Sequence, residues 1–334
     1  MDLAALWFVA IAVLWAGYFF LEGFDFGVGM LLRVLGRDDA ERTGVIDTIS
    51  GVWDGNEVWL IVAAGATFAA FPLWYATMFS GLYVPLLIIL LALIVRGVAF
   101  EFRGHSDDPW WRARWEAALI VGSAVPAVLW GVIWGSILRG LPIGPGYVFT
   151  GDLGDLVSGY GLIGGLTTLV LFTLHGALFL MLRTTGAPAR RARTVAMWLG
   201  PVAIVLAAVF LIRTQVHRGS TATLVTGVVA VVALLGAWLL TRARTAAWAF
   251  VLTGTGIVAG TATLFLALFP AVLPSSLDPA FDITVQAASS SPYTLTIMTW
   301  VAAIFLPVVL AYQAWTYWVF AKRIGMRAGH AAPG

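Results

Sequence analysis

The sequence predicts an all-α fold, a polytopic membrane bundle of about nine transmembrane helices. Hydrophobic residues make up 60% of the chain and charged residues only 11%, and the mean hydropathy is +0.93. Soluble domains carry roughly 25% charged residues, so a chain this poor in charge cannot cover itself against water. Apolar runs of about twenty residues, the length that crosses a hydrocarbon core of roughly 30 Å, recur from one end to the other.

Nine apolar segments account for these runs. They span residues 3–32, 52–71, 75–100, 115–138, 158–182, 194–212, 221–240, 246–270 and 293–320. No stretch between them is long enough for a soluble domain, so we expect residues 1–334 to form a single membrane domain. Helices 1–4 then fall within 3–138, helices 5–8 within 158–270, and helix 9 at 293–320.

Three features of the sequence narrow the classes of function that this chain can have. The chain has no cysteine, which excludes disulfides, iron–sulfur clusters held by thiolates, and thiolate chemistry. The net charge of +2 comes from arginines spread over short loops, so nucleic acid is not an expected partner. The start Met1-Asp2-Leu3 has no basic region, so the first helix is expected to be retained rather than cleaved as a signal peptide.

The basic residues predict the orientation, because cytoplasmic loops carry an excess of lysine and arginine. With the N-terminus outside and the C-terminus inside, sixteen of the nineteen basic residues fall on the inside. The inside group is Arg33, Arg37, Arg42, Arg96, Arg103, Arg112, Arg114, Arg183, Arg190, Arg191, Arg193, Arg242, Arg244, Lys322, Arg323 and Arg327, and the outside group is Arg139, Arg213 and Arg218.

A weak internal repeat fits this topology. Arg33 follows helix 1 as Arg183 follows helix 5, and an Arg-Ala-Arg triplet precedes both helix 4 (112–114) and helix 8 (242–244). A four-helix offset preserves membrane direction, so we expect a parallel 4 + 4 pseudo-repeat with a ninth helix appended. Short basic flanks also recur by chance.

Four acidic residues lie within the first two predicted membrane segments: Glu22 and Asp25 in helix 1, and Asp54 and Glu57 in helix 2. Ionisable groups there cost roughly 2.5–3.5 kcal/mol each and usually face the bundle interior or water. Each pair is spaced i, i+3 and therefore shares one helix face. Helix 1 runs inward and helix 2 starts from the inside, so all four should meet near the cytoplasmic edge, where they could take up protons.

A structural interpretation of the same acids stays open. Asp54 and Glu57 also stand where acids complement the N-terminal dipole of a helix, with Ser50 as an N-cap. Acids at the membrane edge can equally form ion pairs with Arg33 or Arg96. The glycines around the four acids favour close helix packing and hence a buried site.

The positions of the histidines argue against haem ligation by this chain. Haem in a membrane bundle needs axial histidine or methionine, and only His175 lies within a predicted helix. A lone histidine there is more often a hydrogen-bonded packing residue than a ligand. Most of the sixteen tryptophans fall near interfaces, as an aromatic belt does. The alternative that aromatic residues line a quinone-binding cleft is kept, with Trp53 as a candidate weak contact.

Five segments resemble signatures of subunit II of the cytochrome bd quinol oxidases. They are GFDFGVGML at 23–31, WDGNEVWL at 53–60, RGVAFEFR at 96–103, FPAVLPSS at 269–276 and MTWV at 298–301. The resemblance covers essentially the whole chain. It implies a multi-pass subunit of the bacterial cytoplasmic membrane, surrounded by lipid and packed as a pseudosymmetric partner beside subunit I. The resemblance leaves open whether small accessory subunits attach to the complex.

In this family subunit I carries two haems b and one haem d, and this chain would ligate no cofactor or metal itself. The complex oxidises a quinol, menaquinol or ubiquinol, and reduces O2 to water with protons taken from the cytoplasm. The resemblance implies that subunit II stabilises subunit I and contributes acids to the proton path. Matched by motif, these are Asp25 and Asp54, with Glu22 beside them. Glu57 stands where some relatives have glutamine.

The candidate ion-pair partners of these acids and their neighbours are Arg33, Arg96, Glu101 and Arg103. Two other functions fit the same pattern. A proton-coupled secondary transporter would also use membrane acids and a parallel repeat, but it would need a substrate site at the midplane. A purely structural scaffold of the oxidase would use the acids only for ion pairs.

Overall fold

Long apolar runs form the main helices of the structure, a computed structural model that describes residues 2–320. The long helices are α1 (Leu3–Leu35), α3 (Trp53–Ala70), α5 (Tyr83–Phe102), α6 (Pro109–Arg139), α8 (Gly159–Arg183), α9 (Gly186–Arg218), α10 (Thr221–Arg242), α11 (Ala246–Leu268) and α13 (Pro292–Val319). The short helices are α2 (Asp39–Asp47), α4 (Pro72–Gly81), α7 (Leu153–Leu156), α12 (Val285–Ala288) and the 3-10 turns η1 (Arg103–His105), η2 (Pro145–Tyr147) and η3 (Pro279–Phe281).

Prolines explain two of the differences between the predicted and the observed helix boundaries. The predicted segment 75–100 is two helices, because Pro72 opens α4 and Pro85 has no N–H to continue the ladder from α4 into α5. Pro109 at the first position and the side chain of Asp108, which accepts from Trp110 N, start α6 six residues before the predicted 115.

Within residues 2–320, eight helices are long and apolar enough to cross a membrane: α1, α5, α6, α8, α9, α10, α11 and α13. This is one fewer than the nine predicted. The predicted segment 52–71 does form a helix, α3, but at 18 residues it is only about 27 Å long. Its first turns also carry Asp54, Asn56 and Glu57, which lower its hydropathy.

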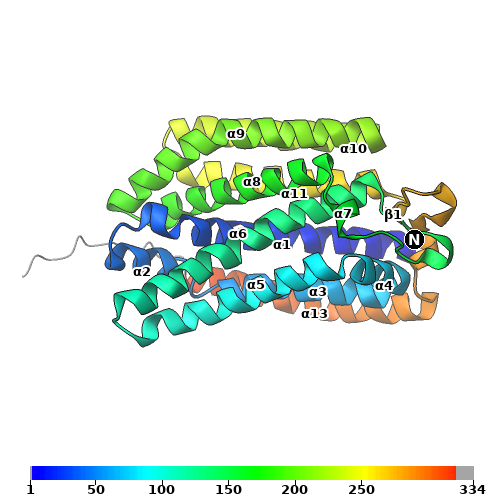
Figure 1. The fold of residues 1–334 in the computed structure, drawn as a ribbon, viewed down its shortest axis with the longest axis horizontal. Coiled ribbons are helices and arrows are strands. Elements are labelled where there is room, and N and C mark those ends of the chain that lie inside the picture. The colour runs from blue at the N-terminus through cyan, green and yellow to red at the C-terminus, as the bar shows by residue number, and fades with distance from the viewer. Residues whose placement is uncertain (1, 321–334) are drawn as a thin grey trace, which may run out of the picture.

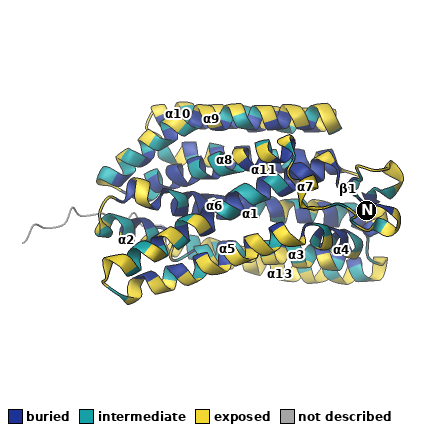
Figure 2. Cartoon of the chain, in the orientation of Figure 1, coloured by how far each residue is buried: buried dark blue, intermediate teal, exposed yellow. Residues whose placement is uncertain are grey.

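Helix α1 lies at the centre of the bundle and packs against α3, α6, α8 and α11 (Figure 1). Helices α9 and α10 form an outer layer on one side, and α13 lies at the opposite side (Figure 1). Figure 2 shows buried residues concentrated along α1 and exposed ones along α10 and α13. The all-α prediction missed one small antiparallel pair, β1 (Ala271–Leu273) with β2 (Ile283–Thr284).

The close contact between α1 and α8 depends on two glycines that face each other. A Cβ on Gly27 would lie 2.7 Å from the Cα of Gly176 and 2.1 Å from the carbonyl oxygen of Phe172. Neither backbone could yield without separating the helices, so only glycine permits this approach. This packing brings the polar part of α1 into the interior.

The arginines assigned to the inside gather at the end of the bundle that holds α2. Arg33, Arg42 and Arg103 bind one carboxylate of α6, and Arg191 of α9 binds α2. At the other end, Arg218 donates to the carbonyl oxygen of Leu138. Three members of the predicted inside group and one histidine, namely Lys322, Arg323, Arg327 and His330, lie outside the described residues.

Candidate functional site

Arg96 of α5 is the centre of the site and is fully buried, although arginine is almost never buried without partners. Its Nη1 donates to Glu22 Oε1 of α1 at 2.5 Å and to Glu57 Oε1 of α3 at 2.9 Å. The rings of Phe26 and Phe100 have their centroids 5.2 and 5.3 Å from the guanidinium carbon, within the range of a cation–π contact. One cation therefore joins three helices.

Asp25 lies one turn beyond Glu22 on α1 and is also fully buried. Asn56 of α3 donates from Nδ2 to Asp25 Oδ2 at 2.6 Å. The Oδ1 of Asn56 accepts from the Tyr317 hydroxyl at 2.6 Å and from Gln313 Nε2 at 3.4 Å, both from α13. We name Glu22, Asp25, Glu57 and Arg96 the acid–arginine cluster.

The three neutral residues around Asp25 were not predicted from the sequence, because only charged residues stand out in apolar segments. One signal was present: Asn56 stands between Asp54 and Glu57 in the same segment. Nothing in the sequence marked Gln313 or Tyr317, because an aromatic residue or an amide near the end of an apolar helix is also typical of a membrane interface.

Several buried polar atoms of the site have no hydrogen-bond partner among residues 2–320. They are Glu22 Oε2, Asp25 Oδ1, Arg96 Nε and Nη2, and Ser123 Oγ. Ser123 belongs to α6 and follows Gly122, which packs against the Cβ of Arg96. Buried polar groups are costly unless they are paired. Each of these atoms can therefore take a further hydrogen bond, and the two carboxyl oxygens can also bind a proton.

Asp54, the fourth predicted acid, does not join the acid–arginine cluster. Its side chain is exposed, and its Oδ1 accepts from the N–H of Gly55 at 2.7 Å. It lies in the first turn of α3, where a negative charge complements the helix dipole. The helix turns the carboxyl of Asp54 away from α1, while Asn56 takes the inward position.

A second group of charges surrounds Glu116 of α6, which is fully buried. Its two oxygens accept from Arg33 Nε at 2.9 Å, Arg42 Nη1 at 3.0 Å and Arg103 Nη2 at 3.0 Å. Arg103 also binds Asp39 of α2 at 2.8 Å. Arg33 and Arg103 are thus ion-paired, but to Glu116 rather than to the acids of the cluster.

Glu116 was not among the predicted site residues, although it lies at the start of the predicted segment 115–138. The structure places it in the second turn of α6. Glu101, a candidate ion-pair partner, is exposed and has no ion pair within residues 2–320. Its carbonyl oxygen lies 2.9 Å from His105 Nδ1.

Helix α2 is attached to α9 by a further ion pair. The Arg191 guanidinium donates to both oxygens of Glu41, at 2.6 and 3.1 Å, and also to the carbonyl oxygen of Leu35. These hydrogen bonds hold the pKa of the Glu41 carboxyl below its usual range. The first part of the connection between α1 and α3 is therefore held by charge to both α6 and α9.

His175 of α8 is fully buried in an aromatic environment. Its Nδ1 lies 2.7 Å from Thr253 Oγ1 of α11, and its ring stacks on Phe250 with centroids 4.4 Å apart and planes at 3°. Phe20 and Phe24 cover it further. The hydrogen bond and the stacking leave one ring nitrogen facing a packed interior.

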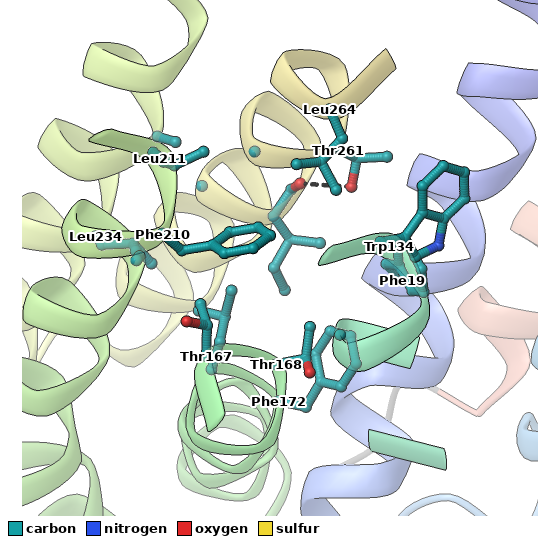
Figure 3. Close-up of a pocket in the computed structure, with 17 residues that line it drawn as sticks. Phe19, Trp134, Thr167, Thr168, Phe172, Phe210, Leu211, Leu234, Thr261 and Leu264 are labelled. Atoms are coloured by element: carbon teal, nitrogen blue, oxygen red, sulfur yellow. Dashed lines mark hydrogen bonds between the residues drawn. The ribbon is translucent and has the colours of Figure 1, made fainter. Parts of the chain in front are cut away.

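An apolar pocket of about 70 Å³ lies between α1, α6, α8, α9, α10 and α11. Phe19, Trp134 and Phe210 surround it, together with the methyl-bearing side chains of Thr167 and Thr261 (Figure 3). Trp53, the candidate quinone contact, does not line it. Trp53 stacks on Phe100 instead, with centroids 4.8 Å apart, and so covers the cation–π partner of Arg96.

Comparison with known proteins shows which family has a sequence like that of this chain. The family described as cytochrome bd terminal oxidase subunit II matches residues 3–320. The chain is 43% identical over 324 residues to cytochrome bd ubiquinol oxidase subunit 2 of Bacillus subtilis, covering 96% of both chains. It is 35% identical over 360 residues to cytochrome bd-I ubiquinol oxidase subunit 2 of Escherichia coli K12, covering 96% of this chain and 94% of the relative.

The fold is shared with a solved structure as well. A chain of the bd oxidase from Geobacillus thermodenitrificans superposes with a TM-score of 0.76 at 17% identity, covering 96% of this chain and 99% of that one. The sequence relatives show in addition that the chain is a multi-pass membrane protein of a bacterial respiratory oxidase. The match from one end of the helical bundle to the other shows that this chain belongs to the cytochrome bd terminal oxidase subunit II family.

Proposed function

We propose that this chain stabilises a haem-bearing subunit I in a quinol:O2 oxidoreductase and supplies part of its proton-uptake path. The relatives from B. subtilis and E. coli are ubiquinol oxidase subunits by name, which supports a quinol as the substrate of the complex. Membership in this family leaves the transporter alternative without support.

The observation that carries the proton path is the composition of the acid–arginine cluster. Three carboxyl groups, those of Glu22, Asp25 and Glu57, surround the single guanidinium of Arg96. If all three were ionised, the cluster would hold two uncompensated negative charges in a largely dry interior, which is costly. Charge balance therefore favours bound protons, and a group that binds a proton in a membrane can pass it on.

The position of the cluster supports proton entry from the cytoplasm. We propose that the N-terminus is outside and that nine helices span the membrane as a single domain, α3 included, in a parallel 4 + 4 arrangement followed by α13. The end of the bundle that holds α2 is then cytoplasmic. Glu22 lies in the half of α1 nearer this end, and Asp54 at the start of α3 is exposed there.

The described residues do not fit axial ligation of a haem. His175 is the only buried histidine among residues 2–320, and its Nδ1 bond to Thr253 and its stacking on Phe250 fix its ring within packed side chains. It does not line the apolar pocket. We therefore propose that the two haems b and the haem d of the complex belong to subunit I.

Helix α13 supports a contact with that partner. Only Leu295 is buried along its length, whereas Trp300, Trp315 and Trp318 are 67%, 57% and 75% exposed. Tryptophan is enriched where proteins associate and at membrane interfaces. A membrane helix with so few contacts to its own chain is suited to pack against subunit I.

The proton path is tested with Asp25→Asn in the intact complex, co-expressed with subunit I. We expect the haem spectrum to be retained and quinol-driven oxygen uptake to fall, because asparagine cannot carry a proton. Asp54→Asn tests the exposed entrance in the same way. Glu101→Gln, an exposed acid at the same end, is the matched control and should keep full turnover. Full turnover in Asp25→Asn and Asp54→Asn would contradict the proton path.

A second candidate function, a purely structural scaffold, is favoured by the ion pairs of Arg96 with Glu22 and Glu57. In that case the acids serve only to neutralise the arginine. Asp25→Asn would then lower haem content or complex yield in proportion to activity. Slow turnover at normal haem content separates the proton path from the scaffold.

A further inference from the structure

A chain of hydrogen bonds with one direction ends on Asp25. The indole Nε1 of Trp59 can only donate, and it donates to Gln313 Oε1 at 3.0 Å. The amide nitrogen of Gln313 must therefore face the Oδ1 of Asn56, 3.4 Å away. The Tyr317 hydroxyl donates to the same oxygen at 2.6 Å. With its oxygen taken by two donors, Asn56 must present its amide nitrogen to Asp25.

This direction fixes which oxygen of Asp25 can hold a proton. The Nδ2 of Asn56 has hydrogens and no acceptor capacity, so Asp25 Oδ2 stays an acceptor whether the carboxyl is charged or neutral. A proton on Oδ2 would meet the amide hydrogen directly. Asp25 Oδ1, in contrast, is buried and has no partner among the described residues. A proton bound by Asp25 therefore belongs on Oδ1.

None of the described charged or titratable groups near Asp25 makes the hydrogen bond that the Asn56 amide makes. They are Glu22 on α1, Asp54 and Glu57 on α3, Arg96 on α5 and Tyr317 on α13. Arg96 donates from Nη1 to Glu22 and Glu57. Within residues 2–320, Asn56 is thus the only side chain that hydrogen-bonds to Asp25.

We infer that Asn56 is a positioning residue for Asp25, oriented by Tyr317 and Gln313 of α13, and that it restricts proton exchange to Asp25 Oδ1. The inference rests on the proposed function, in which Asp25 carries protons. It also gives α13 a role at the site. The helix has one buried residue, yet two of its side chains determine the donor-to-acceptor direction of the hydrogen bonds that end on Asp25.

The test compares Asn56→Leu and Tyr317→Phe with Tyr312→Phe, all in the intact haem-containing complex. Leucine has the branched shape of asparagine but no amide, and phenylalanine removes only the hydroxyl. Tyr312 lies on the same helix but is exposed, which makes it the matched control. The readouts are quinol-driven oxygen uptake and the infrared difference band of the protonated Asp25 carboxyl, identified by its loss in Asp25→Asn.

We expect Asn56→Leu to lower turnover roughly tenfold, the factor that corresponds to losing one hydrogen bond to a charged group, with the KM for quinol unchanged. The carboxyl band should move to higher wavenumber, because a hydrogen bond to the C=O oxygen weakens the C=O bond. Tyr317→Phe should shift the band in the same direction by less. Tyr312→Phe should leave turnover and band unchanged.

Unshifted bands in both Asn56→Leu and Tyr317→Phe would overturn the inference. If Asn56→Leu does not assemble, Tyr317→Phe decides, since it leaves the packing of α13 intact. The outcomes also separate the two proposals. Full turnover of Asp25→Asn, or the lack of any Asp25 band, removes the proton path itself. Slow turnover of Asp25→Asn with unshifted bands in the other variants removes only the positioning role of Asn56.

Discussion

A guanidinium combines N–H donors with a flat, delocalised cation, so one arginine can bind carboxylates and lie against aromatic rings at the same time. Arg96 binds Glu22 and Glu57 on different helices and keeps Phe26 and Phe100 over its plane. Both carboxylates share Nη1, which a lysine ammonium with three donors could imitate. A lysine, however, has no planar group to lie against the two rings. The residue therefore determines how α1, α3 and α5 meet.

Replacing Arg96 by leucine should destabilise the subunit by about 3–5 kcal/mol, because Glu22 is then left as a buried charge without its partner. The midpoint of thermal haem release from the solubilised complex measures this. Arg114→Leu is the control, since Arg114 is exposed and has no ion pair within residues 2–320. Equal midpoints for the two variants would show that Arg96 does not hold the helices together.

At the scale of elements, α2 illustrates how a short helix is kept in place by charge. Isolated helices of nine residues are marginal in water, and only Gly44 and Val45 of α2 are buried. Its position is set instead by Glu41 on Arg191 and by Arg42 on Glu116. Through these ion pairs α2 connects α6 to α9 at the end of the bundle nearest the acid–arginine cluster.

Glu41→Gln should lower thermal stability at neutral pH, but not in acid. Because the pKa of Glu41 is held below its usual value of about 4.3 by Arg191, its stabilising effect is fully present above that value. It is lost as the pH falls through the lowered pKa. Melting temperatures of the two proteins, recorded from pH 7 downward, should therefore converge. A constant difference across this range would contradict the assignment, and Glu101→Gln serves as the control.

At the scale of the whole molecule, α1 is the common neighbour of the functional features. It carries Glu22 and Asp25, packs on α8 through Gly27 and Gly176, and contributes Phe19 to the apolar pocket. The site and the pocket thus lie along a single helix but involve different partners. The surface opposite the α9–α10 layer, formed by α13, is left for the partner subunit in our proposal.

His175→Gln should leave all haem absorption bands of the complex in place. Glutamine can still hydrogen-bond to Thr253 but cannot act as an axial ligand, and His175 is held by Thr253 and Phe250 rather than facing a cavity. Reduced-minus-oxidised spectra, normalised to protein, provide the measurement. Thr253→Val, which removes the hydrogen bond but keeps the histidine, controls for packing. Selective loss of one haem band in His175→Gln alone would assign that haem to this chain.

Much of the helical fold could be predicted because hydropathy is a local property. All nine predicted segments contain helix, and the errors fall where local geometry intervenes, as at Pro72 and Pro85. The short β1–β2 pair was missed, since strands of two or three residues carry too little pattern.

The candidate site was predictable in part. The i, i+3 spacing placed Glu22 and Asp25 on one face of α1, and the glycines around them indicated burial. The spacing could not determine how α3 is rotated about its axis. That rotation puts Asn56 inward and Asp54 outward, so a neutral residue occupies the place expected for an acid.

The sequence by itself determined that this protein lies in the membrane, where its acids fall along the chain, and which family it resembles, because composition, spacing and motifs are properties of short segments. Only the tertiary structure decided which of those acids share Arg96, that Glu116 binds three arginines, and that α13 binds Asn56 beside Asp25. Asn56 and Tyr317 are 261 positions apart. A contact over that distance depends on how whole helices pack and rotate, which no local pattern specifies.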